Sequence, residues 1–134
     1  VLEADPDRVG LTVYVGGYPS LATQRALKFL ASTLPLDIPF FHWSDIDPDG
    51  TWIFRTLERA IQRPLLPHLM SQDLAEAHGE RPSRTSPLRI GEAAGSMISD
   101  LVDYLAGVCA KVMEQEEIDP VLPCYEAWER GHSI

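Results

Sequence analysis

The hydrophobic pattern alternates between strand-like and helix-like segments over the first half of the chain. Residues 11–15 are rich in β-branched and aromatic side chains and stop at two glycines, which predicts a strand buried on both faces. Residues 36–43 form a second apolar run and predict a second strand. Apolar positions three or four apart predict amphipathic helices over 20–33 and 51–62. This order of elements indicates an α/β fold with a parallel sheet and right-handed crossovers.

The second half of the chain has a more helical pattern. Residues 64–70 are a short apolar connection that is consistent with an edge strand, and residues 71–77 predict a turn of helix. Residues 79–87 are polar and rich in glycine and proline, so this loop is expected to be the most mobile segment. A long helix is predicted over 90–117, because apolar residues recur there every three or four positions: Met97, Leu101, Leu105, Val108 and Val112.

Three aspartates, Asp45, Asp47 and Asp49, alternate along the chain directly after the second predicted strand. Ligands of open parallel sheets bind beyond the carboxyl ends of the strands. In an extended segment Asp45 and Asp47 point to the same side, where two carboxylates raise each other's pKa unless a cation lies between them. Hard oxygen ligands suit Mg²⁺ or Mn²⁺. We interpret Asp45 and Asp47 as a divalent-metal site, with Asp49 as an auxiliary ligand.

Three other interpretations of the acidic segment stay open. A calcium-binding EF-hand loop also alternates aspartates, but it requires a glutamate at its twelfth position, which here is Thr56. Phosphatases of the haloacid-dehalogenase type begin with a strand that ends in Asp-x-Asp, although Asp49 stands where their usual threonine follows. The aspartates are also ordinary residues for a helix N-cap and a turn that bind no ligand.

Glycines occupy both predicted strand-to-helix turns. Gly16 and Gly17 precede the first helix, and Gly50 precedes the second. Glycine lets a backbone come close to a phosphate, and the helix N-terminus behind each turn favours an anion. These three residues are therefore candidates for close backbone approach to a phosphate, although a plain turn accounts for them equally well because no complete phosphate-loop pattern is present.

The formal net charge of −9 argues against unaided binding of nucleic acid by this chain. One feature points the other way, because Arg55, Arg59 and Arg63 recur every four residues along one face of the second predicted helix. Such a stripe is typical of a solvated helix face, and beside a metal site it could also steer a phosphate backbone.

The bulk properties indicate one soluble domain over residues 1–134, divided into a β-α-β-α core at 1–63 and a helical C-terminal part at 64–134. The chain begins with Val1 rather than methionine, which suggests a C-terminal fragment of a longer protein. Two cysteines in no metal-binding spacing favour a reducing cytoplasm. No apolar run is long enough for a membrane span, so no membrane partner is expected.

In its order of motifs, the chain resembles the Toprim domains, the metal-binding α/β modules of topoisomerases, primases and related nucleases. The resemblance rests on the Gly-Gly-Tyr-Pro-Ser turn at 16–20 and the Asp-Ile-Asp-Pro-Asp-Gly segment at 45–50, each between a predicted strand and a predicted helix. These motifs are similar to the Toprim part of the topoisomerase VI A subunit. The chain also resembles the C-terminal domain of JetD, the nuclease subunit of Wadjet anti-plasmid defence, and this resemblance extends through Leu69-Met70 to the segment at 113–116.

The resemblance implies a Rossmann-like central parallel sheet flanked by helices, and cleavage of double-stranded DNA by metal-assisted phosphodiester hydrolysis. Asp45 and Asp47 match the metal-binding pair of the family residue by residue. The family's glutamate, at the end of an earlier strand, has no counterpart, because Glu3 lies too close to the strand at 11–15. That first strand is expected before Val1.

As partners, the resemblance implies a second copy of the protein in a homodimer and a condensin-like SMC ATPase complex. It thereby predicts a bacterial, cytoplasmic endonuclease that requires Mg²⁺ or Mn²⁺. A fragment that lacks the glutamate is expected to bind the metal poorly and to be inactive alone. Two alternatives to this function remain: a non-catalytic Toprim-like interaction domain, and a phosphatase of the haloacid-dehalogenase type.

Overall fold

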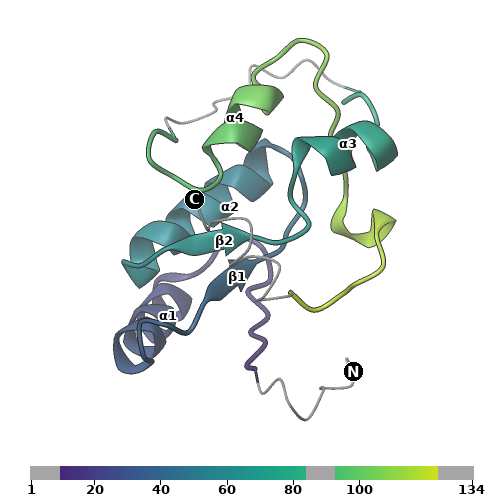
Figure 1. The fold of residues 1–134 in the computed structure, drawn as a ribbon. Helices are drawn as coiled ribbons and strands as arrows, with labels where there is room; N and C mark the ends of the chain where they lie inside the picture. Colours follow the sequence, from purple (N-terminus) through teal and green to yellow (C-terminus); the bar gives the residue numbers. More distant parts are fainter. Residues whose placement is uncertain (1–9, 84–92, 124–134) are drawn as a thin grey trace.

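A two-stranded parallel sheet and four α-helices make up the fold in the computed structural model, which describes residues 10–83 and 93–123 (Figure 1). Phe40 of the first strand lies opposite Leu65 of the second, which confirms a parallel α/β arrangement, although the partner strand is residues 65–67 and not the predicted strand at 11–15. The elements in chain order are α1 (Leu21–Thr33), β1 (Phe40–His42), α2 (Pro48–Ile61), β2 (Leu65–Pro67), α3 (Gln72–His78), α4 (Ser99–Leu105) and the 3₁₀ helix η1 (Gln115–Glu117).

Alternate residues of β1 face opposite sides of the sheet. Phe40 and His42 face α2, since the His42 ring lies edge-on to Phe54 with 5.9 Å between ring centroids. Phe41 and the following Trp43 face the other side, where each ring lies 6.3 Å from His68. The sheet is thus covered by α2 on one face and by aromatic side chains around His68 on the other.

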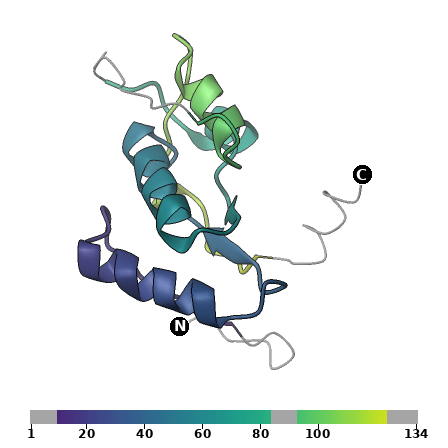
Figure 2. The same ribbon diagram turned by 90° about the vertical axis from the view of Figure 1, so that its left-hand side faces the viewer.

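Helix α1 packs beside α2 (Figure 2). The Ser20 hydroxyl caps α1 by accepting the amide of Thr23, which explains why the helix starts where the sequence predicts. The two helices run in the same direction: Tyr18, just before α1, donates to Asp49 in the first turn of α2, and Arg63, after α2, donates to the carbonyl of Ala31 near the end of α1.

The apolar core lies between α2, the sheet and α4. Phe54 is completely buried, and Ile98 and Leu105 are 1% exposed, so α4 closes the core at the end of the molecule opposite α1 (Figure 1). The remaining core residues include Ile46, Leu57, Ile61, Leu65, Met70, Ala75, Leu101, Val102 and Met113. None of the helices in the described part of the chain combines the length and the apolar character that a membrane crossing requires.

Two of the predicted strands need correction. Residues 11–15 form no strand: Leu11 is 70% and Tyr14 93% exposed, and no described strand lies beside them to supply hydrogen bonds. The second strand is shorter than residues 36–43, since only Phe40–His42 pairs with β2. Leu36 is 88% exposed and lies between Pro35 and Pro39, which lack the backbone N–H groups that a strand donates to its neighbour.

The long helix predicted over 90–117 is wrong. Its described part contains only the short α4 and the single turn of η1, while residues 90–92 lie outside the described residues. Gly95 has φ +78°, which a helix cannot contain, and Val112 and Met113 are extended. Met113 forms an antiparallel bridge with Ile46, and Val112 forms one with Glu80. These tertiary bonds, invisible in the apolar spacing, replace the helix.

The remaining predicted elements are confirmed with small shifts. The helix expected over 51–62 begins three residues earlier, at Pro48. The edge strand within 64–70 is β2, and the helical turn over 71–77 is α3, capped by the Ser71 hydroxyl. Of the loop predicted over 79–87, residues 79–83 contain neither helix nor strand, and 84–87 lie outside the described residues.

Candidate metal centre at the end of β1

The three aspartates lie where β1 gives way to α2, and each has a defined hydrogen bond. Asp47 is the N-cap of α2, and its Oδ1 accepts the amide of Gly50 at 2.6 Å. Asp49 lies in the first turn of the helix, and its Oδ1 accepts the hydroxyl of Tyr18 at 2.8 Å. A proline at the first helical position, Pro48, completes a strong start signal for the helix. The N-cap interpretation is therefore confirmed for Asp47.

Asp45 is held by the C-terminal segment of the chain. Its Oδ1 accepts the main-chain amide of Gln115 at 2.7 Å, across 70 residues of sequence. The next residue, Ile46, exchanges two backbone hydrogen bonds with Met113 at 2.8 and 3.0 Å, which fixes the segment in place. The second carboxylate oxygen of Asp45 has no hydrogen-bond partner among residues 10–83 and 93–123, and the side chain is only half-buried.

The electrostatics of the site are those of crowded negative charge. Burial raises the pKa of Asp47 above its usual value, and the charges of Asp45 and Asp49 raise it further, while the Gly50 amide opposes this. Partial burial raises the pKa of Tyr18, and so does its hydrogen bond to Asp49. Asp45 and Asp49 are thus close enough to Asp47 to make its ionised form costly, as the sequence predicts for neighbouring carboxylates.

Gly50 is required by the local geometry of this turn. A Cβ atom at this position would collide with the main-chain carbonyl oxygen of Asp45 and would lie 3.1 Å from the Ser44 hydroxyl. Gly16 and Gly17 have φ of +72° and +96°, a conformation that other residues rarely adopt. The close approach at Gly50 is therefore to the protein's own backbone, and approach of a phosphate to any of the three glycines stays a prediction.

The donor set fits part of a magnesium shell. Asp45 and Asp47 offer hard carboxylate oxygens, and their repulsion is the condition that a bound cation relieves. Across residues 10–83 and 93–123, no group of three or more His, Cys, Asp or Glu side chains forms a metal site. An EF-hand loop does not form, because α2 begins at Pro48 and its helix occupies the positions that the loop needs.

Two residues of the site were missed by sequence reasoning. Tyr18 belongs to the glycine turn, and its hydroxyl could be linked to Asp49 only once α1 and α2 were known to run side by side. Gln115 contributes a main-chain amide, which carries no side-chain signal at all. Both contacts depend on tertiary packing over long sequence separations.

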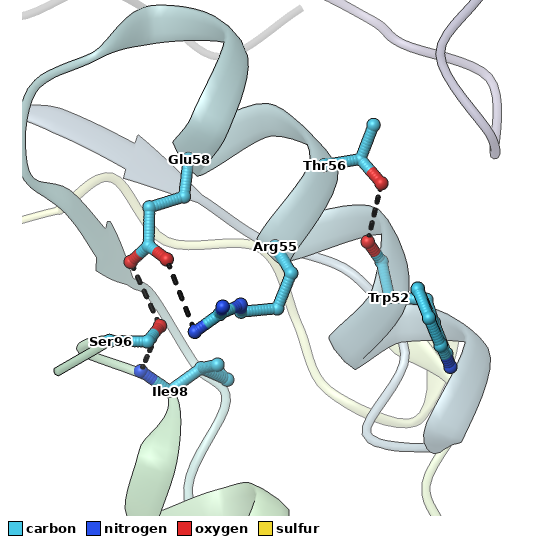
Figure 3. Close-up of polar contacts among 6 residues, drawn as sticks. All are labelled: Trp52, Arg55, Thr56, Glu58, Ser96 and Ile98. Carbon is cyan, nitrogen blue, oxygen red and sulfur yellow. Dashed lines mark hydrogen bonds and ion pairs between the residues drawn. The ribbon is translucent and has the colours of Figure 1, made fainter. Parts of the chain in front are cut away.

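The predicted arginine stripe of α2 divides into three different environments. Arg55 lies 3.8 Å from Glu58, and Glu58 accepts the Ser96 hydroxyl at 2.8 Å (Figure 3). The same hydroxyl accepts the amide of Ile98, so this network joins α2 to the turn before α4. In the N-terminal half of the helix, the Thr56 hydroxyl donates to the carbonyl of Trp52 (Figure 3). Arg55 is therefore a structural residue, Arg59 is exposed, and Arg63 donates to the backbone carbonyls of Pro35 and Ile38.

The fold and the site together define a small α/β domain with a carboxylate cluster at the end of a parallel strand. The family model for the C-terminal part of the Wadjet protein JetD matches residues 4–122, so the chain belongs to that family. Membership implies a part in a Wadjet system. Searches of the curated proteins and of the solved structures found no match to this chain.

Proposed function

We propose that this chain is the Toprim-type catalytic domain of a metal-dependent DNA nuclease within a Wadjet anti-plasmid system. The observation that carries the proposal is the gathering of three aspartates between β1 and the first turn of α2, in a chain that belongs to the JetD family. Burial and the charges of Asp45 and Asp49 raise the pKa of Asp47 there. The partners in this proposal are double-stranded DNA, a second copy of the protein and a condensin-like SMC ATPase complex.

In this proposal Asp45 and Asp47 hold Mg²⁺ or Mn²⁺, and Asp49 assists them. The ion, when bound, neutralises charge that develops on the phosphate under attack. Asp47 supports the site in a second way, because its N-cap bond orients the carboxylate against the first turn of α2. The bond from the Gln115 amide leaves one oxygen of Asp45 for the ion. The third family ligand, a glutamate on an earlier strand, completes the set.

A non-catalytic interaction domain is the second candidate, and one observation favours it. Asp45 and Asp47 each already accept a main-chain amide, so both have a structural use without any ion. A purely structural role requires neither the negative charge of Asp45 nor a response to divalent cations. The two candidates therefore differ in what they predict for asparagine substitutions, which keep a hydrogen-bond acceptor and remove the charge.

The test is cleavage of circular DNA by the full-length protein, in its complex, with Mg²⁺ or Mn²⁺. Asp45→Asn and Asp47→Asn should each reduce cleavage about 100-fold or more, because a metal ion supplies several kcal/mol of charge stabilisation. Asparagine is as good an N-cap as aspartate, so Asp47→Asn keeps the start of α2.

The matched control is Asp37→Asn, which removes one negative charge from an exposed residue outside the cluster. It should cleave at the wild-type rate. Circular dichroism and thermal melting of all three variants check that the fold is kept. Wild-type cleavage by the Asp45→Asn and Asp47→Asn proteins would refute the metal-ligand assignment and leave the interaction domain as the better account.

A further inference from the structure

A groove with an unusual charge lies between α1 and α2. It is open to solvent, has a volume of about 190 Å³, and is lined from α1 by Arg25 and Lys28 and from α2 by Arg59. The other lining residues are Leu21 and Gln24 of α1, Ala60 of α2, and Gln62, which ends α2 in a left-handed conformation with φ 54°. The three cationic side chains are all exposed, so their charged ends reach solvent while their aliphatic stems form the groove wall.

These three cations differ from most other basic residues of the described chain in having no partner. Arg55 pairs with Glu58, Lys111 pairs with Glu76, and Arg63 donates to backbone carbonyls. By contrast, within residues 10–83 and 93–123 no carboxylate forms an ion pair with the groove residues Arg25, Lys28 and Arg59. The chain has a net charge of −9, so three unpaired positive charges around one groove make the local surface charge opposite to that of the whole chain.

Like charges grouped on neighbouring helix faces repel, and an anion in the groove would relieve that repulsion. Arginine and glutamine side chains donate hydrogen bonds with the geometry that phosphate oxygens accept, and lysine adds a point charge. The apolar stems and Leu21 offer no base-specific contact, so recognition would depend on the phosphate and sugar backbone. The chemistry therefore favours a phosphodiester chain.

The groove also lies at a useful distance from the aspartates. Helix α2 connects the two sites, because Asp47 is its N-cap and the groove residue Arg59 lies in its last turn. Twelve residues of helix at 1.5 Å each separate them by about 18 Å, which equals about five steps of one DNA strand. The acidic end repels DNA when no cation is bound, so a basic contact at this distance supplies attraction that the aspartates lack.

We propose that the groove formed by Arg25, Lys28 and Arg59 binds the phosphate backbone of DNA, about five nucleotides from the aspartates. The inference deepens the proposed nuclease function and rests on it for the identity of the ligand. It assigns a positioning role to the groove, which holds the duplex without contact to the reacting phosphate.

The test is the affinity of the full-length protein for a short DNA duplex in EDTA, where metal-dependent cleavage is absent. Replacing all three residues, as Arg25→Gln, Lys28→Gln and Arg59→Gln together, should weaken binding about 10- to 100-fold and lower the slope of log K against log salt by about 3. Two duplexes of unrelated sequence should lose affinity equally. Thermal melting checks that these exposed substitutions keep the fold.

The matched control for charge is Arg81→Gln, an exposed arginine outside the groove, compared with Arg59→Gln alone. Arg59→Gln should lower the salt slope by about 1, and Arg81→Gln should leave it unchanged. The proposed DNA-binding role of the groove would be wrong if the triple variant kept its affinity for DNA. It would also be wrong if Arg81→Gln lost as much affinity as Arg59→Gln. Binding is measured without metal, so the groove and the nuclease function are tested separately. If the triple variant loses affinity but the wild-type protein never cleaves DNA, the nuclease function is refuted and the DNA-binding role of the groove stands.

Discussion

At the scale of single residues, His42 shows how burial sets chemistry. A buried histidine inside an apolar strand is ordinarily hydrogen-bonded. The structure places its ring against Phe54, but the buried Nε2 atom has no hydrogen-bond partner among residues 10–83 and 93–123. Burial lowers the pKa of His42 to about 4 from 6.5, so the imidazole is neutral at pH 7. A buried polar atom without a partner costs stability, which the ring contact with Phe54 partly offsets.

The lowered pKa of His42 predicts acid sensitivity. The unfolded chain takes up a proton as the pH falls below 6.5, whereas the folded protein does so only near pH 4. The stability from the neutral ring is therefore complete above pH 6.5 and decreases as the pH falls to 4, by about 3 kcal/mol. In His42→Phe this loss should disappear, as measured by urea unfolding across pH 4 to 7.

The control for this experiment is His78→Gln, which alters an exposed histidine of α3. It should keep the wild-type pH dependence, because His42 and its buried surroundings are unchanged in this variant. Asp47 has a raised pKa and so contributes in the opposite direction, gaining stability for the folded state as the pH falls. Comparison with wild type removes that contribution. Equal pH slopes for His42→Phe and wild type would contradict the assignment.

At the scale of elements, Arg63 joins the end of α1 to the start of β1. Its guanidinium donates to the carbonyls of Ala31, Leu34, Pro35 and Ile38, at 3.1, 3.3, 2.8 and 2.7 Å. It also lies 4.7 Å from the centroid of the Phe40 ring. Carbonyls at a helix C-terminus lack partners within the helix, and a cation there is favourable. Since α1 packs chiefly against α2, Arg63 provides a direct link from the end of α1 to the strand β1.

Arg63→Lys should therefore destabilise the protein although it keeps the charge. An ammonium group cannot reach four carbonyls in a planar fork, so we expect a loss of about 2–3 kcal/mol, with a larger loss for Arg63→Ala. Urea unfolding with an unchanged m value measures the difference. Arg81→Lys, at an exposed arginine without such contacts, should change stability by less than about 0.5 kcal/mol. A comparable loss in the two lysine variants would contradict this role.

The elements that the sequence predicted well are those with their own local signals. Helices α1 and α2 have caps, Ser20 and Asp47, and several turns of apolar spacing. The failures lie where tertiary bonds decide the conformation. Residues 11–15 have strand-like composition but no neighbour in the described structure, and Val112 and Met113 leave helical spacing to pair with Glu80 and Ile46. Composition alone cannot supply a pairing partner.

At the scale of the whole molecule, opposite charges gather at opposite ends of α2. The aspartates lie at its N-terminus, where the helix dipole favours negative charge, and Arg59 lies in its last turn, where positive charge is favoured. The sequence predicted the position of the aspartates, because their spacing is local. It could not predict the groove, since Arg25 and Lys28 meet Arg59 only after α1 packs beside α2.

Crowding of the aspartates predicts a specific response to divalent cations. If Mg²⁺ binds between Asp45 and Asp47, it stabilises the folded state alone, by about 1.4 kcal/mol at ten times its dissociation constant. That corresponds to an increase in Tm of about 3–6 °C. A chain of net charge −9 also gains stability from any salt, so Mg²⁺ must be compared with Na⁺ at equal ionic strength.

The full-length protein should thus melt at a higher temperature in Mg²⁺ than in Na⁺, and Asp45→Asn should abolish the difference. Asp37→Asn removes the same charge from an exposed position and should retain the whole increase in Tm. The comparison separates the two candidate functions without measuring cleavage, because an interaction domain that uses Asp45 only to accept the Gln115 amide has no preference for Mg²⁺. Identical Tm values in the two salts for the wild-type protein would favour that domain over the nuclease.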